Sequence, residues 1–232
     1  MPKYRYLALA AAGVMVLAPG SVAFAASAHQ AAKHDVLTIK KVNGTAVKKG
    51  AKLTAGLAKG AKLTVSFPTL GSGAGASCAT SEITTKVTSN TTSKATLSLT
   101  GQTTAKCKLT GAIASEATLK SVTAVNLPAD VTVKAAKGGG TVTVSESKSS
   151  KPFGLEATVA IGSTSLTCAF EAKSVTAKAT NSNNSIKVTN ATLTSAKSNS
   201  STCAAVGSTV KVSVTYGPLR DSSAKGAKVF VS

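Results

Sequence analysis

Aromatic residues and histidines are scarce in this chain of 232 residues. Trp is absent, aromatic residues make up 3% of the sequence, and the only histidines are His29 and His34. A Ser-His-Asp hydrolase needs a positioned imidazole, and zinc sites draw on His and Cys ligands. Binding of single-stranded nucleic acid relies on aromatic side chains that stack on bases. We therefore expect no catalytic site, no metal and no cofactor.

Arginine and acidic residues are also few. The chain contains 27 Lys and Arg residues, but only Arg5 and Arg220 are arginines, and Asp and Glu number 8. Because Arg supplies the forked donors that recognise phosphate bidentately, we expect no specific nucleic-acid partner. Glycoside hydrolysis needs two facing carboxylates, whereas Glu156 and Glu171 fall on predicted solvent faces and the other acids are scattered. The sequence predicts a protein that is not an enzyme.

Long hydrophobic runs are absent apart from residues 7–17. That run follows Lys3 and Arg5, stops at Pro19-Gly20, and precedes small-x-small sites at residues 23–25 and 26–28. It is shorter than the ~20 residues that span a bilayer, which argues against a membrane anchor. Residues 1–28 are therefore predicted to be a cleavable secretory signal peptide. The product is expected to be secreted, extracellular or loosely associated with the cell surface, with no membrane contact after cleavage.

Four cysteines form an even set in a chain predicted to be exported. The nearest neighbours in sequence, Cys78 and Cys107, are 29 positions apart, unlike the close pairs of metal sites. Cys78, Cys107, Cys168 and Cys203 are therefore expected to form disulfides. Four cysteines allow three pairings.

Apolar and polar residues alternate with a period of two along most of the chain. The alternation predicts strands at 62–67, 94–99, 155–161, 166–172 and 210–216. The strands are rich in Thr and Val, which suit a pleated sheet. An Ala-rich stretch at 112–119 is the best helix candidate, but no 3.6-residue period is sustained after the leader. The predicted fold class is all-β.

An internal repeat is visible around the cysteines. Cys78-Ala79 and Cys168-Ala169 each open a strand-like run, which passes through an Asn-containing turn and ends at Cys107 or Cys203. We interpret this as two related halves, 29–145 and 146–232, each with its own disulfide (Cys78–Cys107 and Cys168–Cys203). Short strands at this spacing favour an immunoglobulin-like β-sandwich. The alternative is that Thr- and Ser-rich strands all look alike.

Positive charge is the strongest compositional feature, with a formal net charge of +19. Lysines are densest between Lys33 and Lys62. A field of this sign attracts anionic partners, which here would be cell-wall polymers or acidic extracellular polysaccharide. The alternative role is solubility, because lysines on outer faces and edge strands oppose aggregation. The residues predicted for polyanion binding are Lys40, Lys41, Lys48, Lys49, Lys52, Lys59 and Lys62.

Both ends of the predicted mature chain are similar to one family. Residues 37–39, 43–47 and 50–55 resemble the opening, and residues 216–219 and 226–231 the ending, of small secreted actinobacterial proteins. The cysteine pairs and residues 182–189 also match. This family of signal sequence domain proteins is uncharacterised and is usually labelled only by its leader. The resemblance implies the fold and an extracellular address, without an activity. The many lysines and the leader without twin arginines depart from the family pattern.

The function expected from these features is that of a secreted, non-enzymatic, cell-surface or extracellular structural or binding protein. The alternative is an electrostatic binder of anionic polymers that uses its lysine surface.

Overall fold

The computed structural model describes residues 33–146 and 151–232. The predicted signal peptide, His29 and the segment 147–150 lie outside these ranges. The strands are β1 (Leu37–Ile39), β2 (Thr45–Ala46), β3 (Lys52–Gly56), β4 (Leu63–Ser66), β5 (Gly75–Asn90), β6 (Ala95–Thr110), β7 (Thr118–Val125), β8 (Ala129–Ala136), β9 (Gly139–Ser145), β10 (Phe153–Ile161), β11 (Thr164–Ala172), β12 (Ser174–Thr180), β13 (Ser185–Ser195), β14 (Thr209–Tyr216), β15 (Arg220–Asp221) and β16 (Ala227–Val231). Four 3-10 helices connect them: η1 (Pro68–Leu70), η2 (Ala112–Ser115), η3 (Ser201–Val206) and η4 (Ser222–Ala224).

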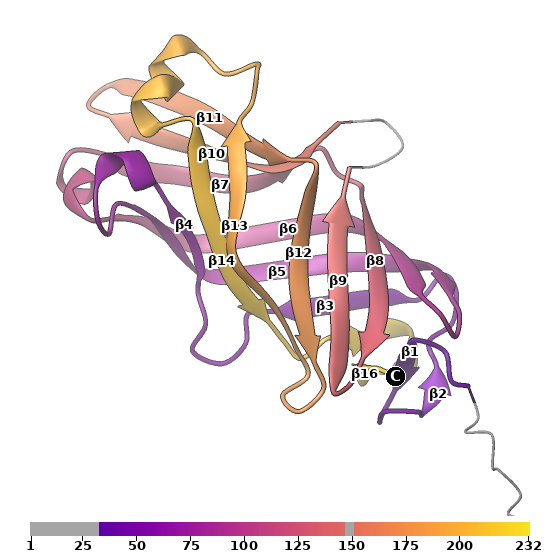
Figure 1. The fold of residues 1–232 in the computed structure, drawn as a ribbon. Coiled ribbons are helices and arrows are strands. Elements are labelled where there is room, and N and C mark those ends of the chain that lie inside the picture. Colours follow the sequence, from indigo (N-terminus) through magenta and orange to yellow (C-terminus); the bar gives the residue numbers. More distant parts are fainter. Residues whose placement is uncertain (1–32, 147–150) are drawn as a thin grey trace, which may run out of the picture. The chain divides into compact units, whose positions relative to one another are not determined.

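Eight antiparallel strands close into a barrel. The order around the ring is β5, β6, β8, β9, β12, β13, β14 and β4, and β4 pairs again with β5. β8, β9, β12, β13 and β14 form the wall that faces the viewer in Figure 1, with β5 and β6 behind it. The predicted all-β class is confirmed.

The period-two pattern places side chains inside or outside the barrel. In β14, Val210, Val212, Val214 and Tyr216 are buried, whereas Lys211 between them is exposed. Successive strand residues point to opposite faces, so the apolar set fills the interior and the polar set meets solvent. The Ala-rich stretch at 112–119, the best helix candidate, forms the short 3-10 helix η2 and the start of β7.

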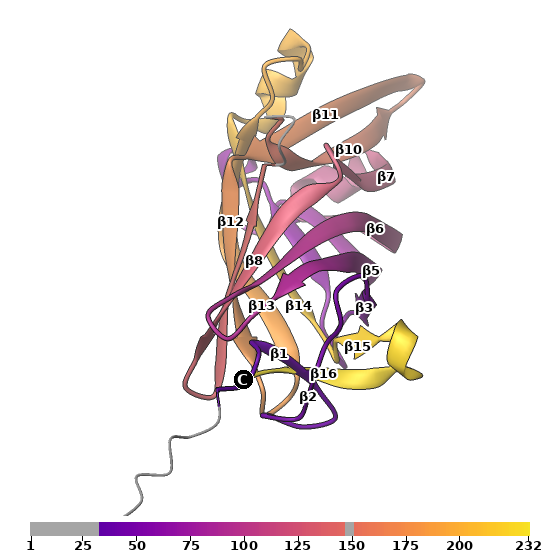
Figure 2. The same ribbon diagram turned by 90° about the vertical axis from the view of Figure 1, so that its right-hand side faces the viewer.

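Three further strands, β7, β10 and β11, form a sheet at one end of the barrel (Figure 2). β11 joins this sheet to the barrel by pairing with β13, at Phe170 opposite Ser195. Ile161 falls on the apolar side of the alternation at 155–161, but its side chain is 54% exposed. The reason is its position at the outer end of β10, paired with Thr164 beyond the buried part of the sheet.

The other end of the barrel carries β1, β2, β15 and β16. β1 pairs with β16, so that Leu37 lies opposite Val231. Leu37, Val229 and Val231 pack in one cluster with buried residues of β8, β9 and β12. These short strands therefore cover the interior at this end.

The immunoglobulin-like sandwich of two halves is not confirmed. Strands from both predicted halves close one ring: the first half supplies β4, β5, β6, β8 and β9, the second supplies β12, β13 and β14, and the two sets join where β9 pairs with β12 and β4 pairs with β14. Gly139, six residues before the predicted boundary at 145/146, belongs to β9, and a Cβ there would clash with the Ala179 carbonyl oxygen of β12. The glycine therefore permits a close strand approach.

Candidate functional site

The seven lysines predicted for polyanion binding are all exposed. They occupy the turn after β1, the loop between β2 and β3, the start of β3 and the turn before β4. One of them, Lys62, lines a surface hollow together with Lys187 of β13. Neither this hollow nor its neighbour, described below, includes the other six.

A second group of lysines comes together on the outer wall of the barrel. In the strand register, Lys134 of β8 lies opposite Thr141 of β9, which lies opposite Lys178 of β12. Lys178 in turn lies directly opposite Lys187 of β13. We call the set Lys62, Lys134, Lys137, Lys178 and Lys187 the lysine face.

Two adjoining hollows run along the lysine face. One, of about 390 Å³, is lined by Lys137, Lys178 and Lys187 together with threonines of β9, β12 and β13. The other, of about 340 Å³, is lined by Lys62 and Lys187. They share Lys187 and Thr189, so the two hollows form one continuous surface.

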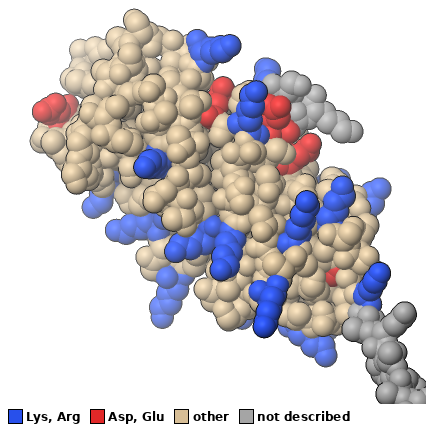
Figure 3. All heavy atoms as spheres, viewed as in Figure 1, with Lys and Arg blue, Asp and Glu red and all other residues tan. Residues whose placement is uncertain are grey.

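The lysine face lacks neutralising carboxylates. No Asp or Glu lines either hollow; β4, β9, β12, β13 and β14 contain none, and β8, which carries Lys134, contains one exposed acid, Asp130. In Figure 3, which has the orientation of Figure 1, Lys and Arg side chains gather over this wall. The acidic side chains in that view lie mainly toward the end with β10 and β11. The face therefore presents uncompensated positive charge to solvent.

Lys178 and Lys187 lie directly opposite each other on the neighbouring strands β12 and β13. Like charges in this arrangement destabilise a sheet by an amount on the order of 0.2–1 kcal/mol. A second such pair, Lys52 of β3 and Lys86 of β5, lies on the far side of the ring. An anion held between two such ammonium groups relieves their repulsion.

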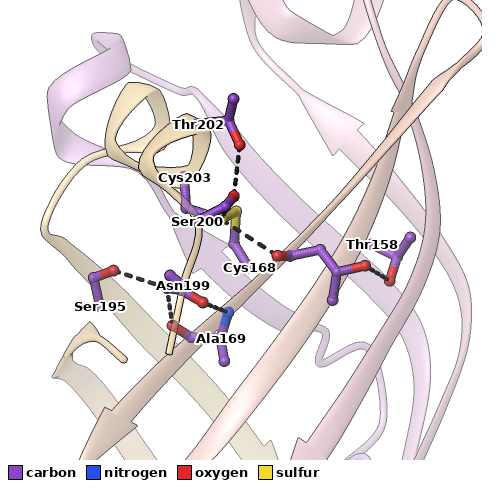
Figure 4. Close-up of a disulfide and its surroundings, with 9 residues drawn as sticks. Thr158, Cys168, Ala169, Ser195, Asn199, Ser200, Thr202 and Cys203 are labelled. Atoms are coloured by element: carbon purple, nitrogen blue, oxygen red, sulfur yellow. Dashed lines mark hydrogen bonds between the residues drawn. A yellow bond between two sulfur atoms is a disulfide. The ribbon is translucent and has the colours of Figure 1, made fainter. Parts of the chain in front are cut away.

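The disulfides follow the pairing that the repeat favours, Cys78 with Cys107 and Cys168 with Cys203. Cys78 and Cys107 lie opposite each other on β5 and β6. Cys203 lies in η3 and joins that segment to β11 (Figure 4). Beside it, the Asn199 side chain accepts a hydrogen bond from the Ala169 N–H at 2.8 Å and donates one to the Ala169 carbonyl at 2.7 Å. These contacts hold the 196–206 segment on the sheet and offer no reactive group.

A polar cluster lies in the barrel interior. The Tyr216 hydroxyl lies 2.9 Å from the Ser81 hydroxyl and accepts a 2.9 Å hydrogen bond from the Gln102 amide. Burial raises the pKa of the Tyr216 phenol above its ordinary value, and the hydrogen bonds with Ser81 and Gln102 oppose that shift. The phenol is therefore neutral at physiological pH. Tyr216 falls on the apolar side of the strand predicted at 210–216, but the sequence does not reveal the cluster, because its members come from β5, β6 and β14.

Within residues 33–146 and 151–232, no group of three or more His, Cys, Asp or Glu side chains has a metal-binding arrangement. No helix in those ranges has the length and apolarity to cross a membrane. Comparison with known proteins gives no match to a family model, to a curated protein or to a solved structure.

Proposed function

We propose that this chain is a secreted, non-enzymatic binding protein that attaches to anionic cell-wall or extracellular polymers through the lysine face. The observation that carries the proposal is the Lys178–Lys187 pair, which lies in a hollow without a carboxylate. A surface that served only solubility would work equally well with lysines spread among acids, as mixed charge also opposes association.

The shape of the lysine face suits a polymer better than a small ion. Its two hollows adjoin and run across β4, β14, β13, β12 and β9. Threonine hydroxyls between the lysines supply further hydrogen-bond donors, including those of Thr141, Thr176 and Thr189. Lysine suits a repeating anion because its ammonium is a hydrated point charge without the fixed geometry of guanidinium.

Secretion is supported by the two disulfides, because such bonds persist in oxidising compartments outside the cytosol. The signal peptide predicted at 1–28 also indicates an extracellular location.

The test is co-sedimentation of the purified protein with isolated bacterial cell walls over a series of salt concentrations. Binding is expected to weaken steeply as salt rises through the physiological range, because exposed charge contacts are screened. The double variant K178Q/K187Q is expected to bind about 2- to 30-fold more weakly, if each lysine contributes as an exposed ion pair does.

The matched control is K52Q/K86Q, which removes the same charge from the other cross-strand lysine pair. This control is expected to bind nearly as well as the parent. Equal losses in the two double variants would show that net charge alone drives binding, and undiminished binding at high salt would contradict the electrostatic mechanism.

A further inference from the structure

An apolar cavity of about 120 Å³ lies inside the barrel. Leucine and valine side chains from nearly every strand of the ring line it, including Leu97, Leu99, Val131, Val188 and Val214. An eight-stranded barrel is wide enough either to be filled by its own side chains or to hold one small ligand. This barrel leaves a space.

One residue of the cavity wall, Thr85, carries a buried hydroxyl without a partner. Thr85 of β5 is 6% exposed and lines the cavity, and its Oγ1 makes no hydrogen bond. Thr85 lies opposite Leu53 of β3 and Leu99 of β6, so apolar side chains flank it. A buried hydroxyl without a partner costs on the order of 1–3 kcal/mol.

The other polar groups of the wall do not satisfy Thr85. Tyr216 and Gln102 also line the cavity, but the Tyr216 hydroxyl is already shared between Ser81 and the Gln102 amide. A buried water needs two to four polar partners. Thr85 supplies a single unpartnered group to a wall that is otherwise almost entirely apolar, which favours a mainly apolar occupant over water.

We propose that the cavity binds a small neutral molecule, about one six-membered ring in size, that carries a single hydroxyl or carbonyl oxygen. The ring would occupy the space among the Leu and Val side chains, and its oxygen would pair with the Thr85 hydroxyl. The volume sets the size limit, because an apolar cavity of roughly 150 Å³ accepts benzene and this one, at about 120 Å³, leaves no room for more than one ring. The neutral Tyr216 phenol is consistent with an uncharged ligand.

Phenol and benzene form a matched pair of probes, because they differ by one hydroxyl. The experiment titrates each into the purified full-length protein and follows the methyl resonances of Leu99, Val188 and Val214 by NMR. Both probes are expected to shift these resonances, with phenol binding about 2- to 10-fold more tightly, the gain of one neutral hydrogen bond.

The variant T85V keeps the side-chain shape and removes the hydroxyl. It is expected to bind benzene as the parent does and to lose the preference for phenol. The variant A177L fills space at the cavity wall and is expected to weaken the binding of both phenol and benzene. If neither probe shifted the methyl resonances, the proposed site would be wrong. If the parent bound phenol and benzene with equal affinity, the role of Thr85 would be wrong.

Discussion

Asparagine side chains act as substitute strand partners in this fold. Asn90 accepts from the Leu37 N–H at 2.9 Å and donates to the Leu37 carbonyl at 2.8 Å. Asn181 makes the same two contacts with Val231, and Asn199 makes them with Ala169. Each asparagine amide pairs with both the N–H and the carbonyl of one strand residue. It therefore takes the place of a neighbouring strand, because buried backbone polar groups need hydrogen-bond partners.

The substitution Asn90→Asp tests this role. The Nδ2 group of Asn90 also donates to the Val47 carbonyl at 3.0 Å, and an aspartate would place an oxygen against both carbonyls instead. We expect the free energy of unfolding to fall by about 2–3 kcal/mol, measured by chemical denaturation.

Asn183→Asp is the control for that substitution. Asn183 is exposed and accepts from the Ser185 hydroxyl, which a carboxylate also does. Its effect is expected to stay within about 0.5 kcal/mol. Similar losses in the two variants would contradict the role assigned to Asn90.

Among the elements, the three-stranded sheet of β7, β10 and β11 depends on the barrel for much of its anchoring. It pairs with the barrel at β13, and its 3-10 neighbour η3 is held by Cys168–Cys203. The Cys78–Cys107 bond lies instead between two long neighbouring strands of the ring. The two disulfides therefore stabilise different regions.

Replacing Cys168 and Cys203 by alanine is expected to cost about 4 kcal/mol, from the 35-residue separation that the bond closes. Hydrogen exchange should rise in η3 and β11 and stay unchanged in β5 and β6. The corresponding replacement of Cys78 and Cys107, 29 residues apart, is expected to cost a similar amount. Its exchange should rise mainly in β5 and β6, and a uniform rise in both variants would contradict separate regions.

The strands themselves could be predicted because alternation is a local signal. Leu63 and Val65 of β4 and the buried side of β14 follow it as expected. Ile161 shows its limit, since a two-residue period gives the face of a strand but not how far along the strand the core extends. That extent depends on which other elements cover the sheet.

At the scale of the whole molecule, the closed ring could not be predicted from local patterns. Closure depends on β4 pairing with both β5 and β14. In the β4–β14 pair, Thr64 and Ser213 are 149 residues apart in the sequence. The lysine face has the same origin. Lys134 and Lys178 are 44 residues apart and Lys178 and Lys187 are nine apart, and all three come together through strand register, whereas the predicted segment 40–62 was chosen for local density.

The β4–β5 seam offers a direct test of closure. A Cβ at Gly75 would stand 2.2 Å from the Val65 carbonyl oxygen of β4. Gly75→Ala is therefore expected to lower the free energy of unfolding by about 1–3 kcal/mol, measured by chemical denaturation. In Gly56→Ala, the new Cβ has its nearest neighbour at 3.9 Å, so that variant should be neutral or slightly more stable. Equal free energies of unfolding for Gly75→Ala and Gly56→Ala would contradict the close approach of β4 to Gly75.

The pairing of β4 with β14 and of β1 with β16 also sets when this protein can fold. Synthesis delivers the N-terminal strands first, yet β4 and β1 find these partners only among the final strands of the chain. Such non-local pairings give a high contact order and slow folding. The nascent polypeptide therefore stays incomplete, with open sheet edges, until translation is nearly finished.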